Sequence, residues 1–111
     1  MFMHRQESAI TKNLRVVEWL KGDLLQSVAA LFKAMARGRE EALIDALAGV
    51  VVTAYVLARR LGFTFSRLDA AVESKLRRNI DQDHEVEKWY RDLSALLQHL
   101  VERKNTDRQT P

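Results

Sequence analysis

The feature that most constrains this chain is an apolar run from Ala42 to Ala58, in which Asp45 is the only charged residue. A helix over this run is hydrophobic on nearly every face, so other protein or lipid has to surround it. Its 17 residues reach only the lower limit for crossing a bilayer, and the flanking segments are strongly amphipathic. We therefore expect a helix buried in protein and no membrane span.

Two long helices are predicted in the first half of the chain. Two glutamates open the apolar run, and two arginines followed by Gly62 close it, which predicts a helix over residues 40–60. Before it, apolar residues recur every three or four positions through residues 10–35. This spacing predicts an amphipathic helix over about residues 8–36, ended by Gly38.

Two further helices are predicted in the second half, over about residues 66–79 and 86–101. Trp89 and Tyr90 open the apolar stripe of the last helix. Aromatic residues in such a position are more often core anchors than ligand contacts, so we expect them to be packed inside.

The predicted fold is an all-α, four-helix bundle-like single domain over residues 8–103, with a flexible segment at 1–7 and a disordered tail at 104–111. The only proline is the last residue, so it interrupts no helix. A domain of 111 residues cannot enclose the apolar helix completely, which predicts pairing with a second copy as a homodimer or tetramer. The lack of cysteine fits a reducing cytoplasm.

The net charge of +3 and the pI near 9.5 raise the alternative of a nucleic-acid-binding protein. However, the 18 basic residues are interleaved with 15 acidic ones, and no basic cluster is accompanied by an aromatic stacking platform. Nucleic-acid binding is therefore not favoured, and it would require an affinity that falls steeply with salt.

Three carboxylates on the first two helices are candidate metal ligands: Asp23, Glu41 and Asp45. Glu41 and Asp45 lie four residues apart, so they share one helix face. Carboxylates one turn apart hold Mg²⁺ in helical proteins that act on nucleoside triphosphates. The same two acids also suit the positive end of the helix dipole without any metal, and this is the simpler interpretation.

Several features follow one another in a recognisable order: a turn at Arg37-Gly38, an acidic helix start at Glu40-Glu41, the segment Leu57-Ala58-Arg59-Arg60-Leu61-Gly62, and then Lys75 and Asn79. This order resembles the MazG-like family of all-α nucleoside triphosphate pyrophosphohydrolases. The resemblance covers about residues 14–79, and residues 86–97 are similar to the C-terminal part of a small branch of the family. It implies phosphate contacts at Lys75 and Asn79, to which Arg78 is adjacent.

Active members of this family carry E-E-x-x-E on one helix and E-x-x-D on the next, and these acids hold Mg²⁺ for cleavage between the α and β phosphates. With the Arg37-Gly38 turn in register, the acidic positions fall on residues that carry no charge, namely Gln26, Ser27, Ala30, Ala46 and Gly49. Gln82 stands where the family has a further arginine. The resemblance therefore implies the scaffold more strongly than the activity.

We therefore expect a MazG-like helical oligomer that is non-catalytic, with Lys75, Arg78 and Asn79 as contacts for a nucleotide or a protein partner. The alternative is an active Mg²⁺-dependent pyrophosphohydrolase whose ligands are displaced to Asp23 and to the Glu41 and Asp45 pair. The two hypotheses differ in whether pyrophosphate is released.

Overall fold

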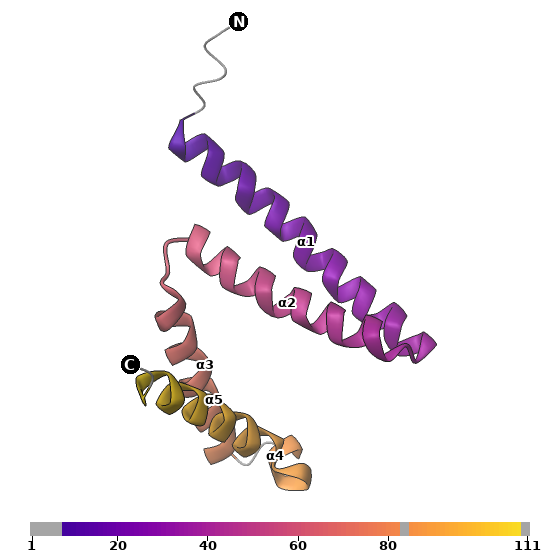
Figure 1. Ribbon diagram of the computed structural model, residues 1–111, viewed down its shortest axis with the longest axis vertical. Coiled ribbons are helices and arrows are strands. Elements are labelled where there is room, and N and C mark those ends of the chain that lie inside the picture. Colours follow the sequence, from indigo (N-terminus) through magenta and orange to yellow (C-terminus); the bar gives the residue numbers. More distant parts are fainter. Residues whose placement is uncertain (1–7, 83–84, 110–111) are drawn as a thin grey trace, which may run out of the picture. The chain divides into compact units, whose positions relative to one another are not determined.

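A computed structural model describes residues 8–82 and 85–109, and this part of the chain contains five helices and no strand (Figure 1). The all-α fold class predicted from the sequence is confirmed. The predicted flexible segment at 1–7 lies outside the described residues.

The first helix, α1 (Ala9–Arg37), lies within one residue of its predicted bounds. Ser8 caps its N-terminus, because the Ser8 Oγ atom accepts a hydrogen bond from the backbone N–H of Thr11 at 3.0 Å. Gly38 ends the helix with a φ of 64°. Glycine adopts this left-handed conformation without a steric penalty, which is why it so often follows a helix.

The second helix, α2 (Glu40–Arg60), covers the apolar run, as predicted. Acidic residues occupy its first turn and basic residues its last, so both ends complement the helix dipole. Its length and mean hydropathy of 1.8 would suit a membrane crossing or the core helix of a soluble protein, and only 11% of its apolar stretch is buried within the chain.

The helices α1 and α2 run side by side in opposite directions and form a hairpin (Figure 1). Small side chains make up the seam between them: Ala34, Ala46 and Thr53 are all less than a tenth exposed. Because the distance between two helix axes depends on the side chains at the contact, this seam allows a close approach. At the open end of the hairpin, the Asn13 side-chain amide donates a hydrogen bond to the Arg60 carbonyl at 3.0 Å.

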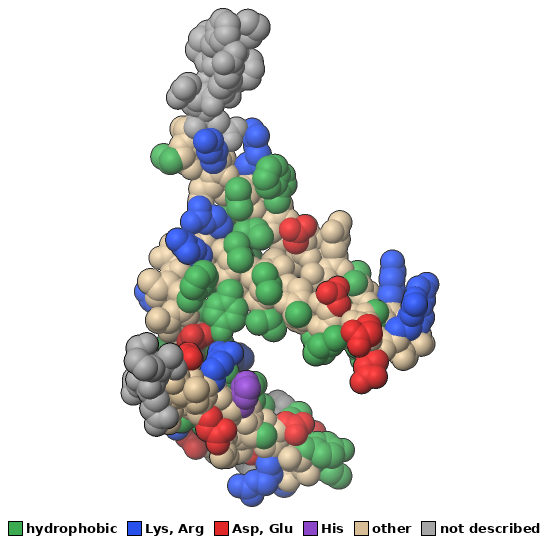
Figure 2. All heavy atoms as spheres, in the orientation of Figure 1, with side chains coloured by type: hydrophobic (Ala, Val, Ile, Leu, Met, Phe, Trp, Pro, Cys, Tyr) green, Lys and Arg blue, Asp and Glu red, His purple; other side chains and the backbone are tan. Residues whose placement is uncertain are grey.

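Many large apolar side chains of the hairpin remain exposed (Figure 2). On α1 these include Leu25 and Phe32, and on α2 they include Leu47 and Val51. Among the described residues, no large side chain is fully buried. A two-helix hairpin has no interior, so burial of these side chains requires another surface.

The third helix, α3 (Phe65–Asp81), begins with an aromatic contact. The Phe65 ring meets the Tyr55 ring edge-on, with the ring centres 5.9 Å apart. The Arg59 guanidinium carbon lies 5.6 Å from the centre of the same Phe65 ring, within the range of a cation–π contact. Further along α3, Leu76 is buried.

The predicted last helix is broken into two, α4 (Glu85–Tyr90) and α5 (Asp92–Gln109). Arg91 separates them in a left-handed conformation, with a φ of 56°. The new helix start is stabilised by a side chain of the preceding helix. The Glu87 carboxylate accepts hydrogen bonds from the Ser94 backbone N–H at 2.9 Å and from the Ser94 hydroxyl at 2.7 Å.

Burial and hydrogen bonding have opposite effects on the Glu87 carboxyl. The hydrogen bond from the Ser94 hydroxyl lowers its pKa, and the Ser94 backbone N–H and the Arg91 charge lower it further, while burial raises it. The net result is a pKa below the ordinary glutamate value. The ionised carboxylate is therefore the form that caps α5.

Two other predictions for this half are corrected. The α5 helix continues to Gln109, so the first residues of the predicted disordered tail at 104–111 are helical, and residues 110–111 lie outside the described part. Trp89 and Tyr90 are each 73% exposed and are not core anchors. The break at Arg91 is the physical reason, because it separates α4 from the apolar stripe that continues along α5.

Contacts divide the chain into two compact units, Met1–Phe65 and Ser66–Pro111. The first unit contains the α1–α2 hairpin, and the second contains α3 from Ser66 onward with α4 and α5. The sequence predicted one domain over residues 8–103. The candidate site residues are divided between the two units.

Candidate functional site

The α1–α2 seam brings together positions that the resemblance assigned to metal ligands. A Cβ atom placed on Gly49 would lie 3.0 Å from the Ser27 Oγ atom, so these two positions are in direct contact. Ala46, one turn before Gly49, is buried, whereas Gln26 and Ala30 are exposed.

The side chains at these positions do not fit a magnesium site. Mg²⁺ in proteins is usually held through one or two carboxylates. The five positions offer one hydroxyl, one exposed amide, two methyl groups and a glycine. The contact between Ser27 and Gly49 also leaves no room for an ion between these two residues.

The structure does not bring Asp23 close to Asp45. Ser27 is level with Gly49, and the helices are antiparallel, so Asp23 lies four residues to one side of this level and Asp45 four residues to the other. At 1.5 Å per residue the two carboxylates are separated by about 12 Å along the hairpin. Two carboxylates that share one Mg²⁺ must place their oxygens within about 4 Å of each other.

Glu41 and Asp45 lie one turn apart near the start of α2, and both side chains are exposed. Acidic side chains on the visible face of the hairpin lie in the half that ends at the turn between α1 and α2 (Figure 2). Among the described residues, no three metal-ligating side chains gather at one point. The Glu41 and Asp45 pair can therefore supply two carboxylates to a cation, and further ligands would have to come from water, substrate or another chain.

Lys75, Arg78 and Asn79 lie together on one face of α3, as their spacing of three and four residues requires. The side chains of Lys75 and Arg78 are exposed, and Asn79 is half-buried. They belong to the second compact unit, whereas the three candidate acids belong to the first.

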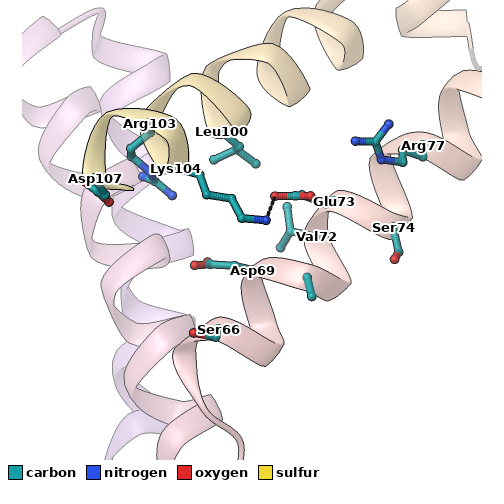
Figure 3. Close-up of a pocket in the computed structure, with 11 residues that line it drawn as sticks. Ser66, Asp69, Val72, Glu73, Ser74, Arg77, Leu100, Arg103, Lys104 and Asp107 are labelled. Atoms are coloured by element: carbon teal, nitrogen blue, oxygen red, sulfur yellow. Dashed lines mark ion pairs between the residues drawn. The ribbon is translucent and has the colours of Figure 1, made fainter. Parts of the chain in front are cut away.

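A charged cleft between α3 and α5 was missed by the sequence analysis (Figure 3). Asp69, Glu73 and Arg77 contribute to it from α3, and Arg103, Lys104 and Asp107 contribute from α5. The signal in the sequence is the spacing of four residues between charged groups on each helix. The predicted disordered tail from residue 104 onward conceals this signal, because it places Lys104 and Asp107 outside any helix.

The chain was compared with known proteins. No curated protein and no solved structure matches it. The sequence model of the MazG-like family matches residues 10–93, which is most of the chain and extends across both compact units. The chain therefore belongs to the MazG-like family.

Proposed function

We propose that this protein is a non-catalytic MazG-like subunit that acts in the cytoplasm, assembles with a second copy of itself and binds a nucleotide or a protein partner. The observation that supports it best is the α1–α2 seam, where Ser27 and Gly49 are in contact at positions that need carboxylates for catalysis. Attack by water on a phosphate assisted by Mg²⁺ requires the metal to be held next to the substrate. Neither residue offers an anionic ligand.

The second candidate function is an active pyrophosphohydrolase with displaced ligands. The exposed Glu41 and Asp45 pair supports it, because these two carboxylates share a face of α2. Asp23 is too far along the hairpin to join them within one chain, so this mechanism would need ligands from elsewhere.

The deciding measurement is pyrophosphate release from a panel of nucleoside triphosphates with Mg²⁺ or Mn²⁺. We expect no release above the background for the wild-type protein or for the Asp45→Asn variant. Release that disappears in Asp45→Asn but persists in Asp23→Asn would replace our proposal with the displaced site. Release that survives both substitutions would contradict both candidate functions.

Phosphate contact is tested separately with a nucleoside triphosphate and the Lys75→Gln variant. If Lys75 contacts a phosphate, removal of its charge should weaken binding about tenfold, the size expected for one charge-assisted hydrogen bond. Isothermal titration calorimetry measures this change, and Lys12→Gln on α1 is a control for the loss of one positive charge. Equal affinities of the two variants would exclude Lys75 from the contact.

A further inference from the structure

The structure leaves Trp89 and Tyr90 at the surface of α4, each 73% exposed, and the proposed function gives neither residue a role. Trp89 lines an open hollow together with Glu85 and Lys88. These three residues stand at positions i, i+3 and i+4 of α4, so their side chains share one face of the helix. The volume of the hollow is about 510 Å³, which is within the range of small-molecule sites.

The three side chains of the hollow offer different kinds of contact. The Trp89 indole presents a flat π-face on which another aromatic ring can stack. The ionised Glu85 carboxylate only accepts hydrogen bonds and can accept two side by side, whereas the Lys88 ammonium group only donates them. Within the described part of the chain, neither of these two charged groups has a hydrogen bond or an ion pair, and all three side chains are exposed. The hollow therefore suits a planar ligand with donors and an acceptor on one edge.

Among planar ligands of this kind, guanine matches the hollow best. Nucleobases stack on aromatic side chains, and proteins distinguish them by hydrogen bonds to the Watson–Crick edge. On guanine this edge carries two neighbouring N–H donors, which suit one carboxylate, and the carbonyl acceptor O6, which suits an ammonium group. Adenine offers only one donor group on the same edge. A simple anion would be repelled by Glu85, and a quaternary ammonium ion would be repelled by Lys88.

We propose that α4 carries a guanine-binding subsite, in which the base stacks on Trp89, Glu85 accepts hydrogen bonds from its N1 and N2 groups, and Lys88 donates one to O6. This inference rests on the nucleotide binding of the proposed function and names the base. The subsite and the candidate phosphate contacts on α3 belong to the same compact unit. Tyr90 lies about 100° around the helix from Trp89 and does not line the hollow.

The test uses the full chain and guanosine, which carries the base without a phosphate, measured by isothermal titration calorimetry. We expect saturable binding at millimolar concentration. Inosine lacks the 2-amino group and should bind about fivefold more weakly, the size of one lost hydrogen bond, and Glu85→Ala should remove this difference. Trp89→Ala should weaken guanosine binding about tenfold through the loss of stacking. Tyr90→Ala is the matched control, because it removes an equally exposed ring outside the hollow.

Three outcomes would overturn the inference: no saturable binding of guanosine, equal affinities for guanosine and inosine, or equal losses in Trp89→Ala and Tyr90→Ala. A nucleoside triphosphate that binds in a manner dependent on Lys75, while guanosine does not bind, would reject the base subsite alone and leave the proposed function intact. Circular dichroism verifies that each variant keeps its helices. Trp19→Phe leaves Trp89 as the only tryptophan, so quenching of its fluorescence by guanosine provides a second measurement of stacking.

Discussion

At the scale of single residues, the contact between Gly49 and Ser27 decides how closely α1 and α2 approach. Alanine normally stabilises the middle of a helix by about 0.5–1 kcal/mol relative to glycine. Here the added Cβ atom would lie 3.0 Å from the Ser27 Oγ atom, which is closer than an ordinary contact. We predict that Gly49→Ala stabilises the protein by about 0.5–1 kcal/mol when Ser27 is also alanine, and by less when it is serine.

Urea denaturation of the four proteins in this double-mutant cycle measures the coupling. The Ser27 Cβ atom lies 3.6 Å from the same position, an ordinary distance, so the serine hydroxyl is responsible for the crowding. Equal effects of Gly49→Ala in both backgrounds would mean that the helices are not in contact at this level.

Single residues also show what could be predicted for the site. The sequence alone predicts that neutral residues occupy the family's acidic positions, at 26, 27, 30, 46 and 49. Aligning the chain with the family pattern requires only one reference point, the turn at Arg37-Gly38. The separation between Asp23 and Asp45 could not be read in this way. It depends on which residues of the two helices are level, and only the contact between Ser27 and Gly49 reveals that.

At the scale of helices, the corner between α4 and α5 depends on one ionised side chain, Glu87. Its pKa is lower in the folded than in the unfolded protein, so its contribution to stability is complete above the unfolded glutamate pKa, about 4.3. This contribution is lost as the pH falls through the lower, folded pKa. We predict that Glu87→Gln reduces the dependence of stability on pH below about 4.3 and destabilises α5 at pH 7.

Thermal unfolding at several pH values, followed by circular dichroism, measures this dependence. Glu102→Gln is the control, because Glu102 is exposed on α5 and accepts a hydrogen bond from the Gln98 side chain. Ser94→Ala should reproduce much of the Glu87→Gln effect, since it removes the hydroxyl donor. A pH profile for Glu87→Gln that matches wild type would contradict the assigned role.

The helices differ in how far local sequence determined them. α1 and α2 have strong signals at both ends, namely Ser8, Gly38, acidic and basic terminal turns and Gly62, and their predicted bounds agree with the structure. The break at Arg91 has no such signal, because arginine seldom adopts a positive φ. It is stabilised by Glu87 reaching Ser94, a contact between residues seven positions apart that helical periodicity does not predict.

At the scale of the whole molecule, the exposed apolar side chains of the hairpin favour a second copy as their partner. Leu25 and Phe32 on α1, and Leu47 and Val51 on α2, lie about 100–180° around their helices from the seam residues Ala34, Ala46 and Thr53, counted at about 100° per residue. These side chains therefore point away from the facing helix and lie on the outer surface of the hairpin. Packing of a second copy against this outer surface would cover these apolar side chains in a four-helix arrangement.

We predict that wild-type protein has twice the mass of the 12.8 kDa chain in solution and that Phe32→Glu converts it to a monomer, because a charge at this position cannot be buried without a partner. Lys33→Glu is the matched control. It introduces the same residue one position later, about 100° further around α1 from the apolar stripe, and should leave the dimer intact. Sedimentation equilibrium measures the mass, and the melting temperature of wild type should rise with protein concentration. A wild-type monomer at micromolar concentration would contradict the prediction that a second copy covers the apolar surface of the hairpin.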